Sequence, residues 1–396
     1  MSSSFTPSSL PEIHRLQQIP SNEGGHTATL AEILQQPATW RATAQQMVDA
    51  LPGLASTLDD VRTIVLTGSG SSEYVGDCVR PHLQRRSAAV VQTVGSGTIL
   101  TDGVDLCAPQ RPALMVSFAR SGDSPESVGA LDKVLELDSN IRHLAVTCNR
   151  DGQLARRAAS GVSLKAIVLD ERTNDRSLVM TSSFTNMVLA AWGLGWAGKS
   201  EEYLSLAETL SACAEELLLA AFSEIPKIAE LPFQRAFYLA DASSYGAARE
   251  SALKMTEMTA GRVMTASETY LGLRHGPMSA VAPHTLVVCF LSSDPVRRSY
   301  EIDLIEELNA KQLGLAKVFV GADVPRGLVQ ENDVVLEHKA FAQIGDDSAA
   351  ILHVLVGQVL GFYRCMKEGL HPDAPSATGV INRVVQKFRL HGVASL

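Results

Sequence analysis

Residues 64–73, with the sequence IVLTGSGSSE, join a short apolar run to a loop of glycine and serine. An unbroken run of Ile, Val and Leu that ends at a Gly-rich segment is typical of a strand buried on both faces. The small residues allow a tight turn, and a helical pattern follows them. This stretch therefore predicts a strand–loop–helix unit of the kind that builds parallel α/β sheets.

The alternation of apolar runs and helical stretches continues along the chain. Further strand-like runs occupy residues 90–93, 114–118, 144–147 and 167–169. A long amphipathic helix from Ser200 to about Phe222 interrupts the alternation, which returns at residues 236–240, 286–290, 317–320 and 334–336. Apolar strands that alternate with helices indicate parallel sheets covered by helices on both faces.

Two serine-containing loops recur at one spacing, which indicates an internal repeat. The pair Ser71-Ser72 matches Ser243-Ser244, and Ser121 matches Ser293, each 172 positions later. Two loops that agree on one offset are stronger than either pair alone, because serines are common after strands. We therefore expect two tandem α/β domains, at 46–199 and at 226–396 with a C-terminal tail. A helix at 200–225 would join them, and an N-terminal arm and helix at 1–45 would precede them.

Composition narrows the function classes. The 396 residues are 45% hydrophobic and 19% charged, with a formal net charge of −9. Binding to a phosphate backbone needs a basic excess, so we expect no nucleic acid partner. The ten histidines show no HExxH or related ligand spacing, and we expect neither a metal nor another cofactor.

The cysteines and the absence of a targeting segment indicate a cytoplasmic protein. The cysteines form no CxxC pair and no secretory signal precedes them, which fits a reducing compartment. The apolar stretch from Met187 to Leu194 is too short to cross a bilayer, and we expect no membrane-spanning run. The six cysteines are Cys78, Cys107, Cys148, Cys213, Cys289 and Cys365.

The first glycine- and serine-rich loop, residues 67–73, is suited to an anion. Backbone N–H groups at a helix N-terminus can approach a phosphate when the side chains are small, and hydroxyls add donors. Ser71 and Ser72 are therefore candidate phosphate ligands. The alternative is a tight turn in which either serine caps the helix. The glycine spacing does not match the dinucleotide-binding GxGxxG pattern.

A second loop, FARSGDSPE at residues 118–126, also lies between a strand and a helix. In a doubly wound sheet the carboxyl ends of neighbouring strands open onto one crevice, so both loops can converge on one ligand. Arg120 can form paired hydrogen bonds to a phosphate while Ser121 and Ser124 donate from the loop. The alternative for Arg120 is a surface ion pair with Asp123 or Glu126.

The sequence GSGSS at residues 68–72, followed by ARSGDS from residue 119, resembles the two phosphate loops of the sugar isomerase (SIS) family. The resemblance covers most of the chain, and from EILQQP at residues 32–37 onward it includes the isomerase half of glucosamine-6-phosphate synthase. The segment SFARSGDSPES at residues 117–127 is similar to that of the family's tagatose-6-phosphate ketose/aldose isomerases, or galactosamine-6-phosphate deaminases. The resemblance implies two tandem SIS domains, each a flavodoxin-like three-layer sandwich, that bind a phosphorylated sugar.

A charged stripe follows the second serine pair, at Glu250, Lys254 and Glu257. Positions i, i+4 and i+7 share one face of a helix, and such stripes are most often solvated surfaces. Alanines around these charges and the RHGP segment at residues 274–277 favour a different interpretation, because together they resemble the family's catalytic segment. The resemblance implies that Glu257 moves a proton between C1 and C2 of the open-chain sugar. Lys254 would stabilise developing oxygen charge, and Glu250 would orient Lys254 or contact the sugar.

His275 lies in a His-Gly-Pro segment that is poor core material. By resemblance it is the ring-opening acid/base, supplied to the active site by the neighbouring subunit, so a homodimer is implied.

Ser182 and Ser183 fall where the family places a further sugar-contacting loop. The alternative is that they cap the apolar helix that follows.

Two departures separate the chain from the synthase. Ser2, not a nucleophilic cysteine, follows Met1, so we expect no ammonia from glutamine. The synthase engages its ketose with a lysine near the C-terminus, whereas residues 373–383 contain none and the next lysine is Lys387. A Schiff base is therefore not predicted.

The resemblance implies an isomerase core that converts a 2-amino-aldose 6-phosphate into a ketose 6-phosphate and ammonia. We favour galactosamine 6-phosphate as substrate and tagatose 6-phosphate as product, by resemblance alone, because no motif encodes the galacto or gluco choice. Simple ketose/aldose isomerisation uses the same proton transfer. A non-catalytic sugar-phosphate sensor would need the phosphate loops but no proton shuttle, and the presence of Glu257, Lys254 and His275 argues against it.

Overall fold

The computed structural model describes residues 9–19, 25–103, 110–161, 163–376, 378–386 and 388–391. Cys107, Lys387 and parts of the expected N-terminal arm lie outside the described residues. By compactness the chain divides into two units. The first-sheet unit comprises Ala38–Asp175, Met180–Glu208 and Ile381–Leu396, and the second-sheet unit comprises Met1–Pro37, Arg176–Val179 and Thr209–Val380. The domain boundaries expected from the sequence stay a prediction.

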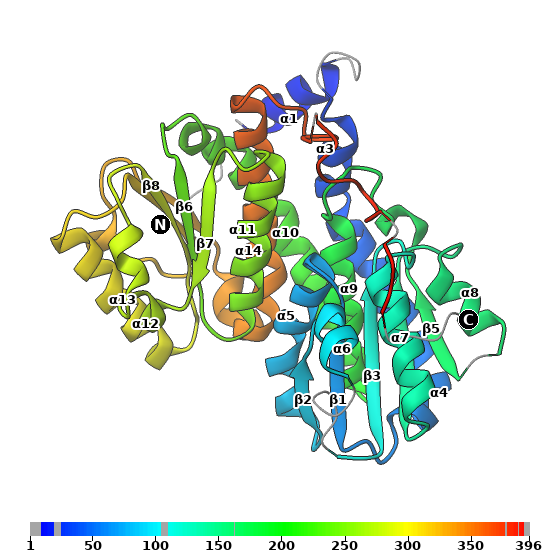
Figure 1. Cartoon of the computed structure of the whole chain (residues 1–396). Helices are drawn as coiled ribbons and strands as arrows, with labels where there is room; N and C mark the ends of the chain where they lie inside the picture. The colour runs from blue at the N-terminus through cyan, green and yellow to red at the C-terminus, as the bar shows by residue number, and fades with distance from the viewer. Residues whose placement is uncertain are drawn as a thin grey trace. The chain divides into compact units, whose positions relative to one another are not determined.

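A five-stranded parallel sheet with strand order β2-β1-β3-β4-β5 forms the centre of the first-sheet unit (Figure 1). Its strands are β1 (Thr63–Thr67), β2 (Val90–Thr93), β3 (Ala113–Ala119), β4 (Ile141–Thr147) and β5 (Leu164–Val168). Its helices and 3-10 turns are α4 (Gln36–Leu58), α5 (Ser71–Arg86), α6 (Ser96–Asp102), α7 (Pro125–Leu137), α8 (Gln153–Ala159), η1 (Glu171–Thr173), α9 (Ser182–Gly193) and η2 (Leu194–Trp196). The strand order is that of a flavodoxin-like doubly wound sheet.

Alternate residues of these strands face helices on opposite sides of the sheet. Val65 belongs to an apolar cluster with Ile99 of α6 and Leu131 of α7. Its neighbour Leu66 faces α5, which comes so close that a Cβ on Gly76 would lie 3.1 Å from the Leu66 Cβ. Because side chains alternate across a strand, the unit is a three-layer sandwich, as the sequence predicts.

The second-sheet unit contains a parallel sheet of five strands in the order β10-β9-β8-β6-β7 (Figure 1). Its strands are β6 (Arg235–Leu239), β7 (Met264–Glu268), β8 (Thr285–Phe290), β9 (Ala316–Gly321) and β10 (Val334–Glu337). Its helices and 3-10 turns are α1 (Ser9–Gln18), α3 (Thr27–Leu34), α11 (Ser243–Met258), α12 (Tyr270–Leu273), η3 (Pro277–Ala280), α13 (Pro295–Ala310), η4 (Arg326–Leu328) and α14 (Ala340–Lys367). Helix α10 (Ser200–Ala229) begins in the segment of one unit and ends in that of the other.

The two faces of this sheet are again distinguished by alternate residues. Cys289 of β8 belongs to an apolar cluster with Leu304 and Leu308 of α13. The next residue, Phe290, stacks instead on the His353 ring of α14, with ring centroids 4.7 Å apart. This unit is also a three-layer sandwich.

The structure confirms the internal repeat. β6 begins 172 residues after β1, α11 begins 172 residues after α5, and both helices contain 16 residues. The residue before each helix has the same left-handed conformation, with φ 57° and ψ −126° at Gly70 and φ 51° and ψ −129° at Ala242. Each sheet also follows the same order when its strands are numbered from its own first strand.

Strand β7 was not predicted from the sequence. This strand pairs with β6 at an edge of the sheet, and none of its residues is fully buried. It contains Thr265, Ser267 and Glu268 and therefore has no apolar run to mark it.

Helix α14 corrects one expectation about the membrane. It is the one helix of the described residues that is long and apolar enough to cross a bilayer, so the expectation that no apolar run reaches that length was wrong. However, 94% of its most apolar window is buried inside the protein. Such burial is typical of a core helix, and α14 packs against α11 (Figure 1).

The close packing of α14 on α11 depends on Gly357. A Cβ on Gly357 would lie 2.1 Å from Ser251 Oγ and 2.5 Å from Ser251 Cβ. We expect Gly357→Ala to lower the free energy of unfolding by about 1–3 kcal/mol, because α14 must shift. Gly53→Ala in α4 is the control, since nothing lies within 4 Å of its Cβ position, and we expect a gain of about 0.5–1 kcal/mol. Urea unfolding measures both, and wild-type stability in Gly357→Ala would contradict the packing argument.

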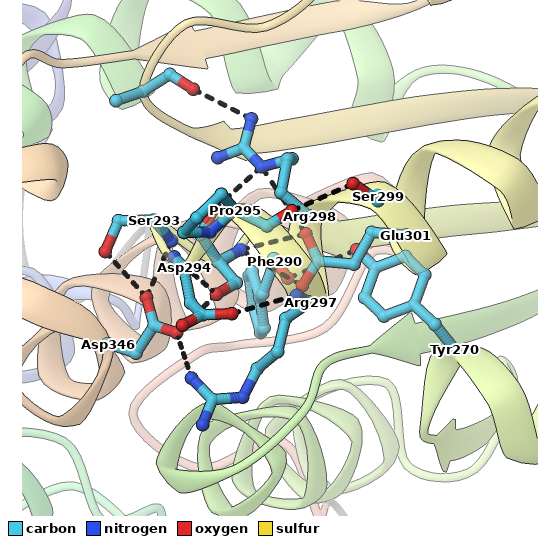
Figure 2. A network of polar contacts seen from close by, with 12 residues as sticks. Tyr270, Phe290, Ser293, Asp294, Pro295, Arg297, Arg298, Ser299, Glu301 and Asp346 are labelled. Atoms are coloured by element: carbon cyan, nitrogen blue, oxygen red, sulfur yellow. Dashed lines mark hydrogen bonds and ion pairs between the residues drawn. The ribbon is translucent and has the colours of Figure 1, made fainter.

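The buried Glu301 of α13 should make the stability of the second-sheet unit depend on pH (Figure 2). Its carboxyl is fully buried and accepts hydrogen bonds from Ser292 N at 2.9 and 3.1 Å. Burial raises the pKa of Glu301 from 4.5 to about 8, against the opposing effects of the Ser292 N–H and of Arg298. The unfolded chain therefore loses this proton first as the pH rises. Stability should fall from about pH 4.5 to about pH 8, the pKa of the folded state, and level off above it.

We expect Glu301→Gln to remove this decline, because the amide stays neutral at every pH. Relative to wild type, the variant should gain stability on the order of 1 kcal/mol or more between about pH 5 and about pH 8. Glu331→Gln, at an exposed position, is the matched control. Urea unfolding at about pH 5 and at about pH 8 measures the free energy of unfolding of each protein. If Glu301→Gln and wild type show the same pH dependence, Glu301 is not the group that causes the decline.

Candidate active site

The first candidate loop joins β1 to α5 and needs glycine at two places. A Cβ on Gly68 would lie 2.5 Å from the Ser72 carbonyl carbon, and Gly70 has a φ of 57°. Ser71 and Ser72 are the first residues of α5, each 6% exposed, so their amides lie at a helix N-terminus. The Ser69 hydroxyl is buried and has no hydrogen-bond partner among the described residues. The loop can therefore offer amide and hydroxyl donors to an anion.

The second candidate loop joins β3 to α7, and β3 lies next to β1 in the sheet. Ser124 immediately precedes α7. Ser121 Oγ accepts a hydrogen bond from Asp123 N at 3.2 Å, and the Asp123 carboxylate accepts one from Gln153 N at 3.0 Å. Both loops follow the carboxyl ends of adjacent parallel strands, so the structure brings their candidate serines to the same edge of the first sheet.

Arg120 is a buried cation at this edge, with 7% of the residue exposed. Its Nη2 donates to the Arg383 carbonyl oxygen at 2.6 Å. The Arg383 guanidinium donates in turn to the Asp175 carbonyl oxygen at 2.7 Å and to Asn174 Oδ1 at 2.6 Å. A guanidinium held beside hydroxyl and amide donors is suited to a phosphate dianion.

Ser182 and Ser183 begin α9 and surround the carboxylate of Asp175. Both serine hydroxyls donate to this carboxylate, at 2.6 Å for Ser183, and the Ser183 and Thr181 amides donate to it at 2.9 and 2.8 Å. Both serines are fully buried. Neither serine caps the helix, since Thr181 stands at the N-cap without a side-chain capping hydrogen bond and Asp175 accepts the amides of the helix start. Sugar contact by these serines stays a prediction.

Glu250, Lys254 and Glu257 form a charged row on α11 in the second-sheet unit. Lys254 Nζ lies 3.3 Å from Glu250 Oε1 and still closer to Glu257 Oε2. The side chains of Glu250, Lys254 and Glu257 are 0%, 1% and 23% exposed. The row is therefore packed, not a solvated face, and Lys254 compensates two carboxylates whose burial unpaired would be costly. Of the three, Glu257 is the group that a substrate can reach.

His275 lies in the exposed turn between α12 and η3 of the same unit. Its backbone amide donates to the Gly272 carbonyl at 2.9 Å, and the following Gly276 has a φ of 126°. The imidazole is thus presented on a turn at the surface, where it can act on a molecule outside its own core.

The structure gathers the candidates in two sets, each within its own unit. The phosphate-loop serines and Arg120 belong to the first-sheet unit, and the charged row and His275 belong to the second-sheet unit. Among the described residues, no group of three or more His, Cys, Asp or Glu side chains is arranged to hold a metal ion.

Two residues of the first-sheet unit that hydrogen-bond to the candidates, Asp175 and Arg383, were not predicted from the sequence. Asp175 left a weak signal, since an acidic residue shortly before a serine pair can satisfy a helix start. Arg383 left none, because it is 263 residues from Arg120 and lies in a segment without helix or strand.

Known proteins share both the sequence family and the length of this chain. A family model described as SIS domain matches residues 57–195. The chain is 34% identical to D-galactosamine-6-phosphate deaminase AgaS of Shewanella sp. (strain ANA-3), over 92% of this chain and 91% of that protein. It is 32% identical to D-galactosamine-6-phosphate deaminase AgaS of Escherichia coli O157:H7, over 92% of this chain and 96% of that protein.

A solved structure extends the similarity to the fold. The crystal structure of tagatose-6-phosphate ketose/aldose isomerase from Escherichia coli superimposes with a TM-score of 0.80 at 29% identity. The match covers 90% of this chain and 96% of that one, so it includes both sheets.

Proposed function

The chain belongs to the SIS-domain family that includes the D-galactosamine-6-phosphate deaminases, and we propose that it is an amino-sugar-phosphate deaminase/isomerase. Its substrate is a 2-amino-aldose 6-phosphate, with galactosamine 6-phosphate favoured, and its products are tagatose 6-phosphate and ammonia. The observation that carries this proposal is the buried row of α11, in which Lys254 lies between two carboxylates and only Glu257 is partly exposed.

Proton transfer by Glu257 is the central step of the proposed reaction. After ring opening, the carboxylate removes the C2 proton and returns it to C1 through an enolamine, which leaves an imine at C2. Water then adds to C2, and the nitrogen leaves as ammonia to give the ketose. Lys254 balances the developing oxygen charge and Glu250 holds Lys254; none of these steps needs a metal or another cofactor.

The phosphate group is assigned to the two loops of the first-sheet unit. Ser71 and Ser72 donate from the start of α5, Ser121 and Ser124 donate from the second loop, and Arg120 supplies the charge. Contact of Ser182 and Ser183 with the sugar is a further part of the proposal.

His275 is proposed as the ring-opening acid/base in the active site of a neighbouring subunit. Its exposed position supports a role outside its own core. The protein would accordingly be a homodimer with shared active sites. We place it in the cytoplasm, with no nucleic acid or membrane partner.

Ammonia release separates this proposal from its alternatives. Purified protein should release ammonia and form ketose 6-phosphate in equal amounts from galactosamine 6-phosphate. A plain isomerase would instead interconvert galactose 6-phosphate and tagatose 6-phosphate and release no ammonia. Binding of these sugar phosphates without turnover would indicate a sensor.

Arg120→Ala should weaken binding of phosphorylated sugars by about 1.5–3 kcal/mol, roughly tenfold to a hundredfold in Kd, because a charged hydrogen-bonding partner is lost. Arg142→Ala is the matched control. Arg142 lies near the start of β4, in register with Leu114, at the opposite end of the sheet from the loops. Isothermal titration calorimetry with galactosamine 6-phosphate and galactosamine measures the effect in proteins that also carry Glu257→Gln, so that the phosphorylated ligand is bound but not converted. An equal loss for both ligands would move the phosphate site elsewhere.

A further inference from the structure

The second-sheet unit repeats the two phosphate-type loops with acidic residues in place of neutral ones. GSGSS at residues 68–72 becomes ADASS at residues 240–244, with the same strand before it and the same helix after it. Ser69 is thereby matched by Asp241. After β8, Ser292 and Ser293 stand where Arg120 and Ser121 follow β3, so the strand-end cation is missing.

A carboxylate of the chain itself fills the second of these loops. Asp346 accepts hydrogen bonds from Ser293 N and Ser293 Oγ at 2.6 and 2.8 Å, and a closer one from Ser292 Oγ. Arg297, one turn into α13, donates to the same carboxylate at 2.7 Å (Figure 2). Burial raises the pKa of Asp346, but these hydrogen bonds outweigh it and hold the pKa below its ordinary value. Hydroxyl, amide and guanidinium donors thus converge on one anion, as they would on a phosphate.

The serines of the first loop also have partners from α14. Ser243 Oγ donates to Asp347 Oδ1 at 2.8 Å, and Ser244 Oγ lies 2.9 Å from His353 Nδ1. Burial lowers the pKa of His353 to about 3, so the ring is neutral and can accept the Ser244 proton. Both loops of this unit are therefore closed by residues of one helix.

The two carboxylates lie just after the kink of α14, much as Ser182 and Ser183 lie at the start of α9. Both helices follow the fifth strand of their sheet and pack on the loop helix, α9 on α5 and α14 on α11. In α14 a kink at Gly345, with a φ of 73°, restarts the helix at Asp346. A carboxylate is longer than a serine hydroxyl and carries the charge that the loop donors require.

We propose that Asp346 is a built-in anion that occupies, in the second-sheet unit, the position of a phosphate, so that this crevice is an oxyanion cradle kept closed by its own chain. The ligand class it would take without Asp346 is a phosphate or sulfate ion. The comparison of Asp346 with a bound sugar phosphate rests on the proposed function. The existence of an anion site at Ser292, Ser293 and Arg297 rests only on their contacts with Asp346. It follows that these two loops do not form a second sugar-phosphate site.

Replacing the carboxylates at these loops tests the proposal. Asp241→Ser/Asp346→Ser restores the serine of the first-sheet loop at position 241 and removes two of the carboxylates at these loops, while Asp347 keeps its contact with Ser243. Asp303→Ser, an exposed position on α13, is the control for a lost carboxylate. Binding of inorganic phosphate to each protein is measured by isothermal titration calorimetry, against chloride at equal ionic strength.

The double variant should bind one more phosphate per chain than wild type, with Asp303→Ser unchanged, and adding Arg297→Ala should abolish the gain. A folded double variant with no gain, or a gain that survives Arg297→Ala, would overturn the proposal. If the double variant does not fold, Asp346→Asn serves instead, because phosphate should raise its melting temperature by more than it raises that of wild type; an equal rise in both proteins would overturn the proposal too. If Arg120 proves not to bind phosphate, the proposed phosphate site of the first-sheet unit fails, but the double variant should still bind its additional phosphate. The failure of the proposed function can therefore be told apart from the failure of this proposal.

Discussion

Glu257→Gln should abolish solvent deuterium exchange at C1 and C2 of the substrate while sugar-phosphate binding stays within about tenfold. The amide keeps the shape of the carboxylate but cannot accept the C2 proton. The change also leaves Lys254 paired with Glu250, so the buried row stays charge-balanced and the variant should fold. NMR in deuterated buffer measures the exchange.

Glu306→Gln is the control for this experiment, because Glu306 is an exposed glutamate on α13 of the same unit. It should exchange at the wild-type rate. Full exchange in Glu257→Gln would show that another group moves the proton.

Inactive His275→Ala and inactive Glu257→Gln proteins should recover activity when they are mixed. If His275 acts in the neighbouring subunit's site, each mixed dimer contains one site with both lesions and one site with neither. Random exchange of equal pools makes half of the dimers mixed, so roughly a quarter of all sites should be intact. Activity should rise from background toward that fraction.

Subunit exchange must be demonstrated in the same mixture, for example with differently tagged pools. If the subunits exchange and activity stays at background, His275 serves its own chain's site or has no catalytic role.

Much of the fold could be predicted because both sheets are buried. Parallel strands covered on both faces read as short apolar runs, and β1, β3 and β8 stand out in this way. The edge strand β7 does not, because its half-exposed residues are largely polar. The repeat was visible because serines after two different strands, Ser71 and Ser121, recur at one offset of 172 residues.

The site was predictable where local sequence and chemistry coincide. Spacing on a helix placed Glu250, Lys254 and Glu257 on one face, although only the structure shows that Lys254 is buried between the carboxylates. Contacts made across long separations could not be predicted. Arg383 contacts Arg120, and Asp346 contacts Ser292, although each pair is far apart in the sequence. Such contacts depend on the tertiary fold and leave no local pattern in the sequence.

The reaction of the unmodified protein with galactosamine 6-phosphate in deuterated buffer tests the central claim most directly. NMR should show tagatose 6-phosphate and ammonia appearing in equal amounts, with solvent deuterium at C1 of the ketose, because the proton removed from C2 exchanges on Glu257 before it is returned. Complete stability of galactosamine 6-phosphate, or a ketose formed without ammonia, would contradict the proposed deaminase.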